Sequence, residues 1–211
     1  MFKKIINSFC LCLGLIGAYL YPYKFNAKLK ILFNRVYSVW ISDMFKSFGK
    51  DSLVQQSMHL LGGKYISIGN KTSIGTRAIL TAWDSYGLAT FYPEILIGNN
   101  VSIGDDCHIT AINRIELGDN VLTGKKITIT DNAHGKSNIE SLSISPLLRP
   151  LYSSGPVYIE DGVWIGDKVT ILANVRIGKN AIIGSNAVVT KNIPANSVAV
   201  GIPANVIKLI E

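Results

Sequence analysis

Cysteine is scarce in this chain: 211 residues hold three cysteines, and their spacing fits no zinc-binding pattern. So few cysteines exclude a small secreted domain that is held together by disulfides. Cys10 and Cys12 lie in an apolar run, and Cys107 falls on a small inward position of the repeat described below. We therefore expect all three to be reduced, as in a cytosolic protein.

Acidic residues are almost missing from the first quarter of the chain. Residues 1–50 carry eight lysines and arginines but one acid, Asp43, whereas residues 51–211 carry 13 basic and 13 acidic side chains. The whole net charge of +7 therefore lies at the N-terminal end. A nucleic-acid-binding protein usually carries a basic face on its folded body, so this distribution argues against a nucleic-acid partner.

Residues 1–60 predict an apolar and basic helical extension. Residues 5–21 form an uncharged, mostly apolar run that is short for a membrane span of about 20 residues. No clear signal-peptide cleavage site follows it. From Phe25 to Phe48 the apolar residues recur at helical spacing, with most lysines on the opposite face. We expect residues 1–50 to contact an anionic membrane surface peripherally, the alternative being packing on the body or on a neighbouring subunit.

An aliphatic residue recurs every six positions along most of the remaining chain and is usually followed by glycine. The recurring positions group into five triplets, in which Thr123 is the one member that is not Ile, Leu or Val. Glycine follows the first and second members in nine of ten cases, with Glu160 as the exception. The triplets are Ile68, Ile74, Leu80; Ile97, Ile103, Ile109; Leu117, Thr123, Ile129; Ile159, Ile165, Ile171; and Ile177, Ile183, Val189.

This period predicts an all-β solenoid over residues 61–207, followed by a short tail at 208–211. Six residues allow a short strand and a corner, with one aliphatic and one small side chain pointing inward and glycine at the bend. Three such segments make a coil of about eighteen residues. About five stacked coils would bury a continuous aliphatic column.

Insertions interrupt the repeat at one corner, between the third member of a triplet and the first member of the next. The two long ones occupy residues 81–96 and 135–158. Insertions on one edge of a solenoid usually mark its working face. The spacing alone therefore predicts a functional site at this corner.

The repeat resembles the left-handed parallel β-helix of the hexapeptide-repeat acyltransferases, and the expected handedness comes from that resemblance. Residues 129–135, with a histidine ahead of the long insertion, resemble the catalytic loop of sugar O-acetyltransferases in this family. The run from Val157 to Ala204 is similar to the coenzyme-binding carboxyl-terminal coils of its acetyl-CoA-dependent members. The resemblance implies a homotrimer that uses acetyl-CoA as co-substrate, with direct transfer and no acyl-enzyme.

Transfer of an acetyl group to a hydroxyl requires a base for the O–H proton, because a neutral alcohol is a poor nucleophile. Histidine is the usual base, and His134 lies at the insertion corner. Asp131 is close enough in sequence to fix the tautomer of the His134 ring. A backbone carbonyl is the alternative partner of that ring. Asn113 lies one coil before His134 at the same corner. By resemblance, it matches an asparagine that contacts the acceptor. Many relatives carry a second histidine where this chain has Asn132.

The other two histidines are not assigned to catalysis. The register assigns His108 to a second segment that faces another edge, and His59 precedes the first predicted coil. A zinc site of the carbonic-anhydrase type needs three converging histidines, which this spacing argues against, so we expect no metal.

The predicted coenzyme site depends on the carboxyl-terminal coils. By resemblance, an exposed tryptophan lies beside the coenzyme arm, and late-coil residues contact the coenzyme. A backbone N–H after the tryptophan would donate to the oxyanion of the transition state. The expected coenzyme-binding residues are Trp164, Gly166, Asp167, Thr190 and Lys191.

One departure concerns the coenzyme phosphates. Many relatives carry Lys or Arg where this chain has Asn205. Lys191 or Lys208 would then supply part of that positive charge, or the affinity for the coenzyme is lower.

The two long insertions supply the expected acceptor-binding residues. Trp83 and Asp84 lie in an aromatic-rich loop that suits the apolar face of a sugar ring. Packing of this loop against the solenoid is the alternative. Arg149 and Tyr152 lie among three prolines, whose fixed φ angles favour a stiff arm.

These features together predict an acetyl-CoA-dependent O-acetyltransferase for a sugar or lipid-linked saccharide, in bacterial cell-surface polysaccharide biosynthesis. We expect it in the cytoplasm, attached to the inner face of the cytoplasmic membrane. Serine O-acetyltransferase and amino-sugar N-acetyltransferase are the alternatives within the enzyme class. A non-catalytic β-helix scaffold is the alternative outside it.

Overall fold

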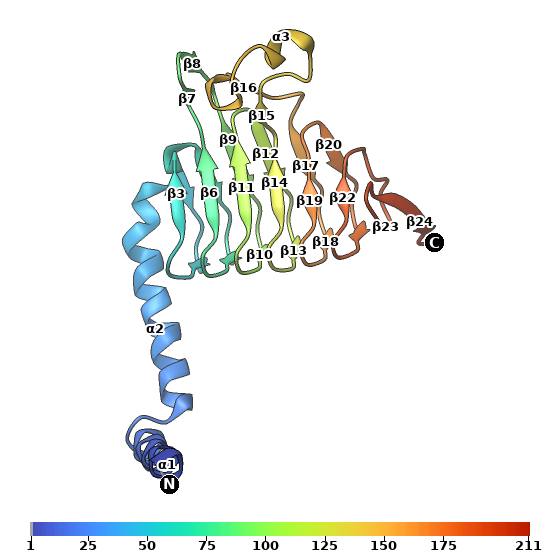
Figure 1. The fold of residues 1–211 in the computed structure, drawn as a ribbon. Helices are drawn as coiled ribbons and strands as arrows, with labels where there is room; N and C mark the ends of the chain where they lie inside the picture. Colours follow the sequence, from blue (N-terminus) through green and yellow to red (C-terminus); the bar gives the residue numbers. More distant parts are fainter. Residues whose placement is uncertain (1) are drawn as a thin grey trace.

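The chain winds into a β-helix whose short strands stack into three sheets, with helices at its N-terminal end (Figure 1). The computed structural model describes residues 2–211. Sheet A contains β1 (Ser47–Phe48), β4 (Ile66–Ile68), β9 (Glu94–Ile97), β12 (Arg114–Leu117), β17 (Val157–Ile159) and β20 (Val175–Ile177). Sheet B contains β2 (Leu53–Val54), β5 (Ser73–Ile74), β10 (Ser102–Ile103), β13 (Leu122–Thr123), β18 (Trp164–Ile165), β21 (Ile182–Ile183), β23 (Ser197–Val200) and β24 (Asn205–Leu209). Sheet C contains β3 (His59–Leu61), β6 (Ile79–Ala82), β11 (His108–Ala111), β14 (Thr128–Thr130), β19 (Thr170–Ile171) and β22 (Val188–Val189).

Each coil adds one strand to each sheet, so the first, second and third members of a triplet lie in sheets A, B and C. Neighbouring coils stack in register, as where Ile68 pairs with Ile97 in sheet A. Every triplet member exposes 4% or less of its surface, including Thr123. The predicted left-handed parallel β-helix with a continuous aliphatic column is therefore confirmed.

The repeat glycines lie where neighbouring coils approach most closely. A Cβ on Gly98 would lie 2.7 Å from the carbonyl carbon of Gly118 in the next coil. The left-handed backbone falls two positions later, for example at Asn100 with φ of 55°. The bend is therefore made by Asn, Asp, Lys and Arg residues, and the glycines permit the close stacking.

The β-helix begins earlier than the boundary predicted at residue 61. β1, β2 and β3 form a coil within residues 47–61, and all but the last of these residues were predicted to belong to the helical extension. At the other end, β24 runs into the predicted tail and pairs antiparallel with β23. The body is thus one coil longer than expected at its N-terminal end.

Two helices precede this body: α1 (Phe2–Leu20) and α2 (Tyr23–Ile41), which is followed by the short 3-10 helix η1 (Ser42–Met44). α2 contacts the first coil through its C-terminal end, where the Ser38 hydroxyl accepts a hydrogen bond from the Val54 N–H at 2.8 Å. A second 3-10 helix, η2 (Gly63–Tyr65), links the first and second coils. The helical extension is therefore confined to residues before the first coil.

The two long insertions project from the same edge of the β-helix (Figure 1). The first forms a hairpin of β7 (Ser85–Tyr86) and β8 (Ala89–Thr90). The second insertion is framed by β15 (Ala133–His134) and β16 (Leu151–Tyr152), which pair antiparallel. Between these strands lie α3 (Ile139–Leu142) and the 3-10 helix η3 (Pro146–Leu148). We call residues 135–150 the arm.

Candidate active site

A cleft of about 420 Å³ lies between sheet C and the bases of the two insertions. It brings the predicted base His134 together with Trp83, one of the predicted acceptor-binding residues. Three histidines, two aromatic residues and several short polar side chains face it. The lining residues are His59, Ile79, Thr81, Trp83, Tyr86, His108, Thr110, Asn132, His134 and Leu151. We call this the histidine cleft.

His134 is held by contacts from both insertions. Its backbone pairs with Leu151 of β16, and its ring packs edge-on against Tyr86 of β7, with ring centres 5.3 Å apart. The Tyr86 hydroxyl donates a hydrogen bond to the Leu147 carbonyl in the arm at 2.7 Å. Tyr86 therefore ties the two insertions together at the imidazole, a role that the sequence analysis did not assign to it.

His108 lies in the histidine cleft, which corrects the prediction that it faces another edge. It is the first residue of β11, so it belongs to sheet C and not to the second segment of its coil. His59 and His108 both pair with Ile79 of the intervening strand β6 and share one row of sheet C. In the part of the chain that the structure describes, no group of three His, Cys, Asp or Glu is arranged to hold a metal ion.

Burial and the nearby charge of His59 lower the pKa of His108 below its ordinary value of 6.5. The unfolded chain therefore binds more protons than the folded chain when the pH falls through that value. His108 stabilises the fold least under mildly acidic conditions, since protonation there favours unfolding.

We expect the free energy of unfolding to fall between about pH 7 and pH 5.5, and His108→Gln to weaken this dependence. Urea titrations across that range measure it. His59→Gln is the matched control, because it removes the charge but leaves the burial of His108, and it should have the smaller effect. Equal pH dependence in wild type and His108→Gln would contradict the assignment.

Thr81 lines the histidine cleft and carries an unsatisfied polar atom, its buried Oγ1. Its side chain is 4% exposed, and its Oγ1 has no hydrogen-bond partner among the described residues. A buried hydroxyl without a partner is costly and uncommon. Thr81 is therefore a candidate for a direct contact with a polar ligand.

Asp131 is buried directly behind the insertion corner. Its Oδ1 and Oδ2 accept hydrogen bonds from the N–H groups of Ile112 and Asn113, each at 2.9 Å, and Oδ1 also accepts from the Asn132 amide at 3.1 Å. Burial raises the pKa of this carboxyl, and the amide donors act against that shift. Asp131 thus fixes the backbone around Asn113, while its action on the His134 tautomer stays a prediction.

Asn113 lines a second cleft of about 370 Å³, to which β16 also contributes both of its residues. Tyr92 and Tyr152 also line this cleft, and Leu151 lines both clefts. The predicted acceptor residues Trp83 and Tyr152 therefore face different hollows that share one wall.

The remaining predicted acceptor residues, Asp84 and Arg149, form their polar contacts with other residues of the chain. Asp84 pairs with Lys64 at 3.1 Å and accepts a hydrogen bond from the Tyr65 hydroxyl at 3.0 Å, and these contacts lower its pKa. The Arg149 guanidinium donates from Nε to the Ile144 carbonyl at 2.9 Å and so closes the arm on itself. Both residues support the insertions, and their contact with an acceptor stays a prediction.

Trp164 lies on sheet B, so a single chain does not bring it into the histidine cleft. Its indole is 51% exposed and lies in one row with Leu122 and Ile182 of the adjacent strands. Thr190 and Lys191 follow β22 at the corner that carries the insertions. The predicted coenzyme residues therefore lie on both borders of sheet C.

Gly166 and Asp167 form part of the corner between sheets B and C. The Gly166 N–H donates to the Ile183 carbonyl at 2.8 Å, and the Asp167 N–H donates to the Ser185 hydroxyl at 3.1 Å. Neither N–H is therefore free to donate to an oxyanion, and coenzyme binding by these residues stays a prediction.

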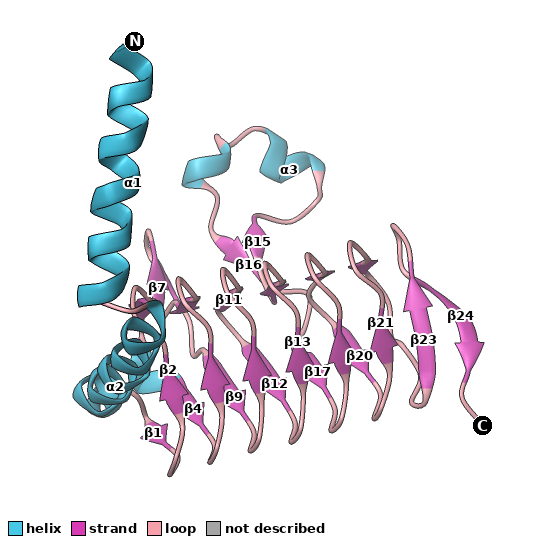
Figure 2. Ribbon diagram, turned by 90° about the horizontal axis from the view of Figure 1, so that it is seen from below, coloured by secondary structure: helices cyan, strands magenta, loops and turns pink. Residues whose placement is uncertain are grey.

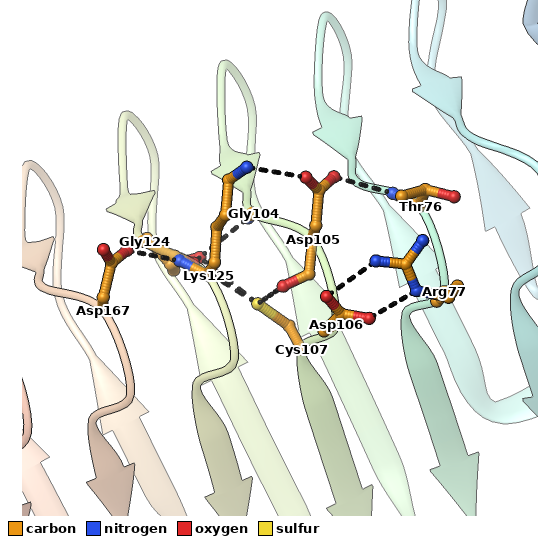
Figure 3. A network of polar contacts seen from close by, with 10 residues as sticks. Thr76, Arg77, Gly104, Asp105, Asp106, Cys107, Gly124, Lys125 and Asp167 are labelled. Atoms are coloured by element: carbon orange, nitrogen blue, oxygen red, sulfur yellow. Dashed lines mark hydrogen bonds and ion pairs between the residues drawn. The ribbon is translucent and has the colours of Figure 1, made fainter. Parts of the chain in front are cut away.

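The same corner is stabilised by carboxylates that reach from one coil to the next. The Asp167 carboxylate accepts from the Lys125 N–H at 2.7 Å, and Asp105 does the same for Thr76 at 3.1 Å (Figure 3). Each acidic side chain thus satisfies a backbone donor of the preceding coil. These contacts explain the acidic residues after the repeat glycines.

Comparison with known proteins agrees with this fold. The family model "Bacterial transferase hexapeptide (six repeats)" matches residues 156–191. The chain is 38% identical over 118 residues to "Putative lipopolysaccharide biosynthesis O-acetyl transferase WbbJ" of Escherichia coli (strain K12), an alignment that covers 54% of this chain and 60% of that relative.

Solved structures match over more of the chain. A maltose O-acetyltransferase from Clostridium difficile 630 has a TM-score of 0.59 at 29% identity, covering 89% of this chain and 86% of its own. The N-acyltransferase AntD from Bacillus cereus, in complex with dTDP-4-amino-4,6-dideoxyglucose and coenzyme A, has a TM-score of 0.67 at 20% identity, covering 83% of this chain and 89% of its own. At that identity the second match supports the fold alone.

Proposed function

Because the chain belongs to the hexapeptide-repeat acetyltransferase family, we propose that it is an acetyl-CoA-dependent O-acetyltransferase. Its proposed acceptor is a sugar hydroxyl, carried on a lipid-linked saccharide in bacterial cell-surface polysaccharide biosynthesis. The E. coli relative, whose printed name gives an O-acetyl transferase of lipopolysaccharide biosynthesis, supports this acceptor class. The chain aligns with less than two thirds of that relative, so activity and acceptor are inferred for this chain.

The histidine cleft is the observation that carries the proposal. A sugar presents an apolar ring face and several hydroxyls, and this cleft offers both kinds of contact. Trp83 and Tyr86 provide aromatic surface, and the unpartnered Thr81 hydroxyl and the half-buried His108 provide polar contacts. His134 lies beside them, within reach of a bound hydroxyl.

The transfer follows from these groups. The imidazole of His134 accepts the proton of the acceptor hydroxyl while that oxygen attacks the thioester carbonyl carbon. The C–S bond then breaks, and the coenzyme A sulfur leaves with the electron pair and takes up the proton held by His134. The products are the acetyl ester and coenzyme A, and no group on the protein is acetylated.

Asp131 acts as a positioning residue in this proposal. Its two oxygens hold the N–H groups of Ile112 and Asn113, which fixes the corner between the two clefts. Asn113 and Tyr152 then extend the acceptor site into the second cleft, where a longer saccharide would lie.

The proposed coenzyme site is shared between two chains. Trp164 and His134 lie on different sheets, and Trp164 does not line the histidine cleft of its own chain. We propose a homotrimer in which the exposed row of Leu122, Trp164 and Ile182 meets a neighbouring subunit. Gly166, Asp167, Thr190 and Lys191 complete the proposed coenzyme site.

Calorimetric titration of acetyl-CoA tests the donor. Wild type is expected to bind one molecule per chain, and Trp164→Ala to bind about tenfold more weakly, as expected for the loss of an aromatic contact. Trp40→Ala is the matched control, because Trp40 is 77% exposed on α2, far from the carboxyl-terminal coils, and its loss should leave the affinity unchanged. No binding heat with folded wild type would favour the scaffold alternative.

An acceptor panel then tests the reaction class. Neutral sugars, amino sugars and serine are each incubated with acetyl-CoA, and free thiol release is followed. Acetylation of a neutral sugar supports the proposal, whereas preference for an amino sugar or for serine would replace it with the corresponding alternative.

A further inference from the structure

α1 is an apolar helix that contacts none of the β-helix. None of its residues is buried, and the exposed side chains include Phe9, Leu13 and Ile16. It is long and apolar enough to cross a membrane by length and composition, and its 19 residues span about 28 Å, close to the thickness of a bilayer's hydrocarbon core. A fully exposed apolar helix requires a partner that the rest of the chain does not supply.

α2 carries four of the eight basic side chains of residues 1–50. Lys24, Lys28, Lys30 and Arg35 lie on it, and the first acid of the chain is Asp43. Only its C-terminal end packs on the body, through Asn34, Ser38 and Ile41. An exposed basic surface with no acid beside it complements an anionic lipid surface.

The apolar helix α1 and the basic helix α2 run in different directions. α1 is seen end-on in Figure 1 and lengthwise in Figure 2, whereas α2 is the reverse. The arm extends to the same side of the β-helix as α1 (Figure 2). The exposed apolar residues of the arm are Ile139, Leu142, Ile144, Leu147 and Leu148. If a membrane surface is drawn perpendicular to α1, α2 therefore lies along that surface. The tip of the arm points toward the same surface.

We propose that this side of the molecule seats the protein on an anionic bilayer, with α1 inserted in the hydrocarbon and α2 lying along the lipid headgroups. Tyr19, Tyr21 and Tyr23 at the junction are suited to the interface between the two regions. The histidine cleft then lies near the membrane, where a lipid-linked acceptor would be presented, a consequence that rests on the proposed function. The proposed membrane binding itself does not depend on the proposed function.

The distribution of charge also sets the orientation. Two lysines precede the apolar part of α1 and four basic residues follow it within α2. The side of a membrane helix with more Lys and Arg faces the cytoplasm. The β-helix therefore lies on the cytoplasmic side.

The native cysteines provide the first test. Cys10 and Cys12 are exposed on α1, and Cys107 is buried in the β-helix. The full chain is treated with a membrane-impermeant maleimide, with and without vesicles of phosphatidylcholine containing roughly a quarter phosphatidylglycerol. Mass spectrometry is expected to count two labels without vesicles and none with them.

The lysines of α2 provide the second test. Lys24→Gln, Lys28→Gln and Lys30→Gln combined should weaken binding to the anionic vesicles about 100-fold, since each lysine near a charged surface contributes roughly fivefold and the three factors multiply. The matched control combines Lys71→Gln, Lys126→Gln and Lys179→Gln. These exposed lysines lie on the β-helix, and their substitution removes the same amount of charge. The control should bind the vesicles as wild type does.

Three results would overturn the proposal. Thiols that stay reactive on vesicles would show that α1 does not insert. Thiols protected without lipid, in a larger oligomer, would assign α1 to a contact between copies. A mature protein in cells that lacks residues 1–20 would identify them as a cleaved leader. Each result is independent of acetyltransferase activity, so it leaves the proposed function standing.

Discussion

Replacing His134 with alanine is expected to lower kcat for acetyl transfer by about 10² to 10⁴-fold. The imidazole is the base of the proposed reaction, and without it the acceptor must lose its proton to water. The affinity for acetyl-CoA should stay unchanged, because the predicted coenzyme residues lie elsewhere. Steady-state kinetics with the best acceptor of the panel, together with calorimetry, measure both quantities.

Thr81→Val is the contrasting variant in the same cleft. Valine keeps the shape of the side chain and removes the hydroxyl, so it should raise KM for the acceptor about fivefold and leave kcat nearly unchanged. Added imidazole should partly restore the activity of His134→Ala, because the truncated side chain leaves room for it. A His134→Ala enzyme with wild-type kcat would exclude His134 as the base.

The fold followed closely from the sequence because each coil repeats one local rule. Each coil of the repeat contacts only the coils next to it, so an inward aliphatic residue every six positions is enough to specify the packing. All of these residues are buried in the structure. The first coil was missed although its strands keep the period. Phe48, Val54 and Leu60 pair with Ile68, Ile74 and Leu80. Trp40, Met44 and Phe48 also have helical spacing, and this coincidence hid the start of the repeat.

The site was less predictable because the insertions are not periodic. The repeat assigns a residue to a sheet, and the error for His108 was one of phase: the residue before a triplet member already belongs to that member's strand. His134 depends on β15 and β16 pairing across the arm, which no six-residue rule encodes. The pairing of Tyr86 with His134 joins residues 48 positions apart, so only the folded insertions reveal it.

The glycine after most first and second triplet members was predicted correctly as a position but for an incomplete reason. A bend suggests left-handed backbone, yet that conformation lies two residues later, at positions such as Asn100 and Asn120. The glycines instead allow the backbone of the next coil to pack directly against them. Glu160 occupies one such position, and the left-handed conformation again falls two residues later, at Gly162 with φ of 67°.

This distinction gives Gly98→Ala a large expected cost. The added Cβ would lie 2.6 Å from Asp119 Oδ1 and 2.7 Å from the Gly118 carbonyl carbon and oxygen, so two coils would have to separate. Asp119 cannot move freely, since its Oδ1 accepts the Asn99 N–H at 2.7 Å. We expect a loss of about 3 kcal/mol in the free energy of unfolding, or roughly 10 °C in Tm.

Asn100→Gly separates close stacking from backbone conformation in the same corner. Asn100 has φ of 55°, which glycine adopts without steric cost, so relief of strain offsets the extra freedom gained by the unfolded chain. The net change should stay within about 1 kcal/mol of wild type in urea titrations. A larger loss at Asn100 than at Gly98 would mean that the left-handed turn, and not the approach of the coils, fixes the glycine repeat. The smaller loss is expected because the Cβ contacts at Gly98 involve backbone that neighbouring coils hold in place.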